Sequence, residues 1–455
     1  MELLLGLTPC RAPLPAWTVA RVLGTPFSHP LRGITLCGVA VAVVLCSCKR
    51  EPVSPAPAMP QRAYVWQRDW NQRVTDAIAR SRGDLAGYVI LACEIEWRNG
   101  RPHPVIPEVD WPGVRDQNTT ISPAIRVMPY PGPFAEDDAT IRFLCETAGV
   151  RLAAIRATGI EPRELQLDFD CAQKKLAGYA KWVRALRITI APLPLVITTL
   201  PCWLDEPEFP NLVRAASGYV LQVHSIASPR GPDHSMVCDP DLARGWTARA
   251  SAIGVPFQIS LPTYRTIAGY DASGRNIGSY ADGTQAAWPP GTTVREYATD
   301  LDAMAALVAS WQARHPDHCT GLLWYRLPVA SDHQNCPWPA LRALTQGRAP
   351  IRSWAVRING RDVKDQEPTS LVDVSLVNTG ETDELSMTAI TLSWEKPAKL
   401  VLAEPLAGWR MTCEDNQVTF KRADPHPRLT LEQEHAIGWV RLDNPARIQA
   451  YVQSQ

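Results

Sequence analysis

Between residues 63 and 346 the sequence alternates short apolar, β-rich runs with helical patterns or long loops. Eight such runs fall at 63–70, 86–97, 124–130, 165–170, 193–204, 219–225, 256–264 and 321–327. Helical patterns fall at 72–80, 137–148, 174–186 and 294–314. A βα alternation of this length is typical of a parallel sheet closed into a barrel. The sequence therefore predicts a (β/α)₈ barrel over 63–346.

The texture of the sequence changes at about residue 351. Five short runs rich in β-branched and aromatic residues follow, namely "SWAVRING", "LVDVSLVNTG", "AITLSWE", "QVTFKRA" and "IGWVRLD". Turn residues separate them and no helical period appears, which is typical of a sandwich. We therefore expect a small all-β sandwich domain over 351–455, to which fold alone assigns no function.

The first 48 residues read as a leader and lipoprotein signal peptide. Arg32 precedes the apolar run 34–45, and the sequence "LCSC" at 45–48 resembles a bacterial lipobox in which Cys48 is lipidated. The run is short for a membrane span but suits a signal peptide, although an uncleaved anchor is the alternative. Residues 49–62 form a Pro-rich linker. We expect a lipid-anchored protein of the cell envelope, with Lys49 favouring the periplasmic face of the outer membrane.

Composition excludes some partners. Lys plus Arg and Asp plus Glu both total 46, so no global field attracts nucleic acid or an anionic membrane surface. No zinc-like Cys/His spacing appears, and we expect neither a metal nor a cofactor. The 16 Trp outnumber the 11 Tyr and 7 Phe; indole rings suit stacking on sugar faces, although most fill cores. In an oxidising compartment some of Cys202, Cys238, Cys319 and Cys336 could pair.

Polar side chains repeat on one face of several strand-like runs. In 165–170 the apolar residues occupy one face, and Asp168 and Asp170 the other. The apolar face must meet the helices, so both aspartates point into the barrel. The same alternation places Val89, Leu91, Cys93 and Ile95 outward and the following polar residues inward: Glu94, Glu96, Arg126, Gln222, His224, Gln258 and Ser260. Active sites of such barrels lie at the C-terminal ends of the strands.

Two interpretations of this polar group stay open. Unpaired buried charges cost several kcal/mol, so the residues must pair, shift pKa or face a wet pocket. They form either a ligand site or a structural network in which Arg126 pairs with Glu94 or Asp168. The long loop 263–292 carries Tyr264, Tyr270, Tyr280 and Trp288. These rings either hold an extended saccharide or anchor the loop on the barrel.

Several runs carry a family resemblance. "AYVWQRDW", "LQLDFDCAQKKLAGYAKWVRALR", "ITTLPCWL" and "GYVLQVHS" together resemble a bacterial envelope family catalogued as a domain of unknown function, which looks like a distant relative of barrel glycoside hydrolases. Run 165–170 is also similar to the "DxxDxDxE" strand of family 18 chitinases. Asp168 and Asp170 match the later aspartates, but Leu165 and Ala172 replace the first aspartate and the glutamate. Trp324 resembles the Trp that floors the chitinase pocket. The missing glutamate means that the chitinase mechanism does not carry over intact.

The site residues suit hydrolysis of an envelope or extracellular polysaccharide. Glycoside hydrolysis generally needs one protonated and one ionised carboxyl group about 5–10 Å apart. Asp168 or Asp170 would supply one, and Glu94 or Glu96 the other. Arg126 would orient a carboxylate, while Gln222, His224, Tyr264 and Trp324 would hold the sugar. The alternatives are a saccharide-binding lipoprotein without catalysis and a structural envelope scaffold, so enzyme activity stays open.

Overall fold

The computed structural model describes residues 58–454, except 116–118, 131, 135–138, 225–235, 281–286, 366, 384–386, 407 and 424–427. The predicted leader, Cys48 and most of the Pro-rich linker lie outside the described residues. Within these ranges no helix has the length and hydropathy that a membrane crossing requires. None of the eight cysteines in these ranges forms a disulfide bond, so the pairing that an oxidising compartment would allow among Cys202, Cys238, Cys319 and Cys336 is not observed.

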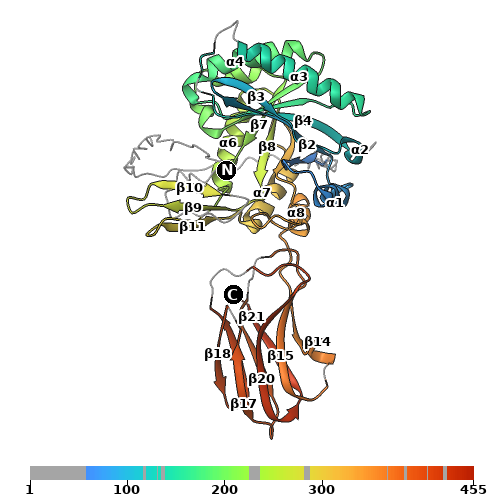
Figure 1. Cartoon of the computed structure of the whole chain (residues 1–455), viewed down its shortest axis with the longest axis vertical. Helices are drawn as coiled ribbons and strands as arrows, with labels where there is room; N and C mark the ends of the chain where they lie inside the picture. Colours follow the sequence, from blue (N-terminus) through green and yellow to red (C-terminus); the bar gives the residue numbers. More distant parts are fainter. Residues whose placement is uncertain are drawn as a thin grey trace, which may run out of the picture. The chain divides into compact units, whose positions relative to one another are not determined.

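The first part of the described chain is a closed parallel barrel (Figure 1). Its strands are β1 (Gln61–Val65), β2 (Gly87–Arg98), β4 (Thr120–Val127), β5 (Leu165–Phe169), β6 (Leu195–Thr199), β7 (Gly218–Gln222), β8 (Phe257–Pro262) and β12 (Cys319–Tyr325). Each pairs in parallel with the next, and β1 closes the ring by pairing with both β2 and β12. The structure confirms the predicted (β/α)₈ barrel.

Helices lie between the barrel strands and after the last of them. They are α1 (Gln72–Ser81), α2 (Trp111–Val114), α3 (Ala139–Ala157), α4 (Leu176–Thr189), α5 (Phe209–Ala215), α6 (Pro240–Ala252), α7 (Leu301–Ala313) and α8 (Trp338–Thr345). Polar caps fix several starts, because Asn71, Asp239 and Asp300 accept hydrogen bonds from backbone N–H groups of the first turn. The helix predicted over 294–314 is therefore too long at its start. Asp300 begins α7 at Leu301, and the residues before it form a strand.

Two β insertions extend the barrel beyond its strands. Strand β3 (Arg101–Val105) pairs antiparallel with the end of β2. Strands β9 (Thr266–Tyr270), β10 (Asn276–Tyr280) and β11 (Thr293–Tyr297) form a three-stranded sheet in the order β10–β9–β11, which Figure 1 shows as a small separate sheet. The sequence predicts a long loop here, and that prediction is wrong. Glycines and polar residues hide the strand pattern.

Packing separates an outer and an inner face of the barrel wall. The outer core, between strands and helices, takes Leu165, Leu167 and Phe169 of β5 together with most large helix residues. A smaller inner cluster fills the middle of the barrel: Tyr64, Trp66, Val89, Leu91, Ala124, Val196, Val220 and Leu323. Polar residues lie on both sides of this apolar layer, and one of these two polar groups forms the site described below.

The remaining strands form a β domain with a core of its own. One antiparallel sheet has the order β14–β13–β15–β20–β17, with β13 (Trp354–Ile358), β14 (Arg361–Asp362), β15 (Thr369–Asn378), β17 (Leu400–Pro405) and β20 (Glu434–Ala446). The other has the order β18–β19–β16–β21, with β16 (Met387–Trp394), β18 (Trp409–Glu414), β19 (Gln417–Arg422) and β21 (Ile448–Ser454). Val374, Ile390 and Phe420 lie in the core that both sheets contribute to. The predicted all-β domain is confirmed.

Candidate functional site

The polar layer toward the N-terminal ends of the strands forms a satisfied network. Arg62 donates hydrogen bonds to Ser122, Glu164 and Gln258 at 2.9, 2.6 and 2.7 Å. Gln166 donates to Glu164 at 2.9 Å and accepts from the hydroxyl of Tyr64 at 2.8 Å. All of these residues are buried. Because the charged groups Arg62 and Glu164 are paired with each other, we interpret this layer as structural support below the site.

The polar layer at the C-terminal ends contains a chain of alternating charges. Glu94 is 0% exposed and forms an ion pair with Arg68. Nε of Arg68 lies 2.5 Å from Oε2 of Glu94, and Nη2 of Arg68 donates a hydrogen bond to Oε1 of Glu94 at 3.1 Å. Arg126 lies between Glu94, at 3.5 Å, and Asp168, at 3.8 Å. Thr198 donates a hydrogen bond to Asp168 at 2.7 Å. Four strands thus contribute neighbouring side chains.

Asp170 differs from the other carboxylates of this group. It follows β5 directly, is exposed to solvent on one side, and has no ion pair or hydrogen bond to any described residue. The surrounding protein nevertheless displaces water from it. Burial, and then the negative charge of Asp168, raise its pKa to about 6, although Arg126 opposes the shift. Burial also raises the pKa of Asp168, against the lowering effects of Arg126 and the Thr198 hydrogen bond.

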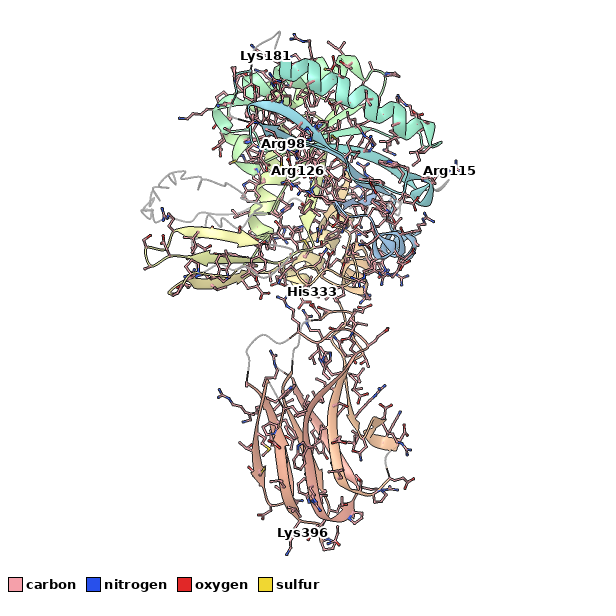
Figure 2. All side chains as sticks on the ribbon, viewed as in Figure 1. Arg98, Arg115, Arg126, Lys181, His333 and Lys396 are labelled. Carbon is pink, nitrogen blue, oxygen red and sulfur yellow. The ribbon has the colours of Figure 1, made fainter. Side chains whose placement is uncertain are left out.

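Two polar side chains of the site keep unused hydrogen-bonding groups. The side chain of Arg126 is 16% exposed, and it donates no hydrogen bond to the described part of the chain. Figure 2 labels it among the barrel strands. Gln222, at the end of β7, is half-buried and also has no hydrogen-bond partner among these residues. Guanidinium and amide groups in this state are available to a ligand or to water.

An aromatic wall closes one side of the site. Tyr325, the last residue of β12, stacks on His224 with ring centroids 5.8 Å apart and planes at 21°. His224 contacts the Tyr264 hydroxyl at 3.0 Å and Ser260 at 3.4 Å. Burial lowers the pKa of His224 to about 4 and, with other charges of the site, raises that of Tyr325 to about 12. The wall is therefore uncharged at neutral pH, which suits stacking and hydrogen bonding to a neutral ligand.

Two residues predicted for the site lie elsewhere. Trp324 is 0% exposed in the outer core and donates a hydrogen bond to Gln61 at 2.9 Å. It faces the helices because its neighbour Tyr325 takes the inward position, so the Trp324 ring does not line the polar site inside the barrel. Glu96 is 27% exposed and pairs with Arg98 at 3.3 Å on the part of β2 that pairs with β3. No ion pair among the described residues joins Glu96 to Arg126.

The directions predicted along β2 are wrong for its first half. Val89 and Leu91 lie in the inner cluster, whereas Cys93 and Ile95 lie in the outer core. A β-bulge causes the switch: Leu91 pairs with Ala124 and Cys93 with the very next residue of β4, so Ala92 is an extra residue. After the bulge Glu94 points inward, as expected.

Sequence reasoning missed three members of this site. Arg68 lies after the end of β1, where strand alternation no longer applies. Thr198 lies on β6, and a neutral hydroxyl group in a strand does not indicate a site as a charged side chain does. Tyr325 was one of two neighbouring aromatics whose faces stayed undecided. The described residues contain no group of three or more His, Cys, Asp or Glu that could hold a metal ion.

Part of the barrel matches a protein family whose function is unknown. Residues 122–330 match the family model described as "Domain of unknown function (DUF3142)", which confirms the predicted resemblance. No curated protein matches the chain. A chitinase from Bacillus thuringiensis is 10% identical, with 87% of this chain and 100% of that chain covered and a TM-score of 0.42.

Two further solved structures show a similar relationship. The spore cortex-lytic enzyme of Bacillus cereus is 12% identical, with 64% of this chain and 74% of that chain covered and a TM-score of 0.44. A chitinase from Rhizomucor miehei is 13% identical, with 63% and 99% covered and a TM-score of 0.43. Similarity at this level carries no conclusion about activity, which must come from the side chains.

Proposed function

We propose that the protein binds a polysaccharide at the C-terminal ends of its barrel strands and hydrolyses a glycosidic bond there, with Asp170 as the proton donor. One observation carries this proposal. Asp170 is the exposed, unpaired carboxyl group beside the ion-pair chain, and its pKa is raised to about 6. A general acid works best when its pKa lies near the operating pH.

The neighbouring residues support this role. Asp168 is held by Thr198 and Arg126, so its charge stays close to Asp170 and favours the protonated form of that acid. Tyr325 and Tyr264 offer ring surface, while Gln222 and Arg126 offer unused N–H groups to sugar oxygens. The ligand class that fits such a wall is a neutral saccharide, since two aspartates would repel an anionic one.

One observation favours a second candidate, saccharide binding without hydrolysis. Two-carboxylate mechanisms need a second available group, but Glu94 is fully buried between Arg68 and Arg126. Asp168 is then the remaining neighbour of Asp170, and its own oxygens already contact Thr198 and Arg126. A purely structural role accounts for this ion-pair chain but leaves the exposed Asp170 without a purpose.

Purified protein incubated with a panel of neutral polysaccharides tests the proposal. Release of reducing ends and binding by affinity electrophoresis should be measured for wild type, Asp170→Asn and the exposed β-domain control Asp373→Asn. We expect wild-type release to fall as the pH rises through about 6, because the acid is then deprotonated. Asp170→Asn should lose release at every pH, and the control should not.

The outcomes separate the candidates. Binding without release, weakened by Asp170→Asn, supports the saccharide-binding function. If Asp170→Asn changes neither release nor binding, the site assignment is wrong.

We also propose that a lipid on Cys48 anchors the protein in the cell envelope, where such a substrate would occur. The support is the apolar run 34–45 followed by "LCSC". Cys48→Ser should prevent incorporation of labelled fatty acid and leave unprocessed precursor. Normal labelling of this variant would refute the anchor.

A further inference from the structure

The ion-pair chain gives Arg68 a role that its position outside the strands does not suggest. We infer that Arg68 is a positioning residue: by neutralising Glu94 it keeps Arg126 available to Asp168 and Asp170. This inference rests on the proposed function, because it explains how the charge state of that site is set. Arg68 itself lies beyond the end of β1, with a side chain 37% exposed.

The distances show that Arg68, rather than Arg126, is the main ion-pair partner of Glu94. Arg68 approaches both of its carboxylate oxygens, at 2.5 and 3.1 Å. Arg126 comes no closer than 3.5 Å and donates no hydrogen bond to Glu94. A carboxylate without water, such as Glu94 at 0% exposure, requires a close cation. Arg68 meets that requirement, so Arg126 is not drawn fully toward Glu94.

The position of Arg126 affects the pKa of Asp168 and of Asp170. Arg126 lies 3.8 Å from Asp168, and its charge lowers the pKa of Asp168 and Asp170 against the raising effect of burial. Without Arg68, the buried Glu94 would attract Arg126, and both aspartates would lose part of that stabilisation. The pair should then take up protons at a higher pH.

Other groups around the two aspartates do not supply a replacement cation. Those that interact with them electrostatically come from five elements or their ends: Tyr64 of β1, Glu94 of β2, Arg126 of β4, Tyr179 of α4 and Tyr325 of β12. Thr198 of β6 adds a neutral hydrogen bond. Arg126 is the single positive charge in this described set, which makes its position decisive.

Carboxyl NMR of the full chain labelled with ¹³C-aspartate tests the inference without any ligand. Asp168→Asn and Asp170→Asn first assign the two signals. In Arg68→Met we expect the upper apparent pKa of the pair to rise by about one unit or more, as loss of a nearby cation predicts. Arg68→Lys, which keeps the charge, should recover most of the wild-type titration.

Two controls keep the result interpretable. Arg98 is the exposed ion-pair partner of Glu96 on β2. Arg98→Met should leave the titration of Asp168 and Asp170 unchanged. The double variant Arg68→Met/Glu94→Gln removes both charges of the pair, so it should fold even if Arg68→Met does not. Its aspartates should titrate at the wild-type pH or below it, because Arg126 then has no competing carboxylate and the negative charge of Glu94, which raises the pKa of Asp168, is gone.

The results decide between mechanisms. An unchanged titration in Arg68→Met overturns the inference. A double variant whose titration stays shifted upward does so as well, since Arg68 would then act directly on the aspartates. If Arg68 shifts the titration but Asp170→Asn leaves polysaccharide release and binding intact, the positioning role stands and the proposed function fails.

Discussion

Trp324 and Tyr325 are neighbours on β12 with opposite surroundings. The indole of Trp324 lies among outer-core residues with its N–H bonded to Gln61, and the ring of Tyr325 lies in the barrel beside His224 and Tyr64. Successive side chains of a strand point to opposite faces, so only one of the two can reach a ligand. Both are aromatic, and the sequence alone does not distinguish them.

Truncating these two residues should therefore have different effects. Trp324→Ala should lower the free energy of unfolding by about 3–5 kcal/mol, the usual cost of removing a buried aromatic ring, and leave saccharide affinity unchanged. Tyr325→Ala should cost less stability and weaken saccharide binding, because the half-buried ring faces the site. Denaturant unfolding followed by circular dichroism, with affinity electrophoresis, measures both. Weaker binding in Trp324→Ala than in Tyr325→Ala would contradict this assignment.

Asp170 should also make the free energy of unfolding depend on pH. Its pKa is about 6 in the folded protein and ordinarily 3.8, so between these values the folded state binds more protons than the unfolded one. The free energy of unfolding must then fall as the pH rises through this window and level off above it. In Asp170→Asn this part of the decrease should be absent. Unfolding curves at pH 4, 5, 6 and 7 test this, and parallel pH profiles would refute it.

Among the elements, the sheet β9–β11 has one packed and one open face. Ala268 and Tyr297 are buried against Val237 on the packed face. On the open face Trp288 lies over Gly269 and Gly278, and its ring centroid is 6.1 Å from that of Tyr280. The four aromatics of this segment thus divide: Tyr264 and Tyr270 pack near the buried cluster, and Tyr280 and Trp288 do not.

The two glycines under Trp288 provide a matched test. A Cβ at Gly269 would lie 2.4 Å from Cζ3 of Trp288, whereas one at Gly278 would lie 3.5 Å away. Gly269→Ala should therefore displace the ring and destabilise the sheet by about 1–3 kcal/mol. Gly278→Ala should be neutral or slightly stabilising. Hydrogen exchange of the β9–β11 amides reports the difference, and equal protection in the two variants would contradict it.

The accuracy of sequence reasoning differs between elements for physical reasons. In β5 one face is apolar and the other carries Asp168, so alternation alone gives the directions. In β2 both faces are apolar at Val89 and Leu91, and nothing in the sequence reveals the bulge at Ala92. Arg68 lies where no periodic element extends, so its pairing with Glu94 depends on how the chain folds back in three dimensions.

On the scale of the whole molecule, the described chain has separate cores. Core residues of the barrel run from Met59 to Leu344, in the outer, inner and insertion clusters. Those of the β domain run from Val356 to Ile448. No residue belongs to both sets. Stability of each part should therefore come from its own buried surface.

Separating the parts tests this independence. A chain ending at residue 347 should keep the far-ultraviolet circular dichroism of a (β/α)₈ barrel and unfold cooperatively, because its apolar clusters are complete. Residues 351–455 expressed alone should give a β spectrum and a transition of their own. An insoluble or non-cooperative barrel fragment would show that the β domain is required for the barrel's stability.

The bulge at Ala92 has a consequence for how this barrel tolerates change over evolutionary time. Substituting Ala92 by another small residue keeps the two-to-one pairing with β4. Deleting it would restore regular pairing without inverting the residues downstream, because Leu91 already lies opposite Ala124 and Cys93 opposite the next residue of β4, so Glu94 would still point inward. Loss of a single codon at this point would thus keep both faces of the strand end, and lineages descended from this chain should vary here in length as well as in residue type.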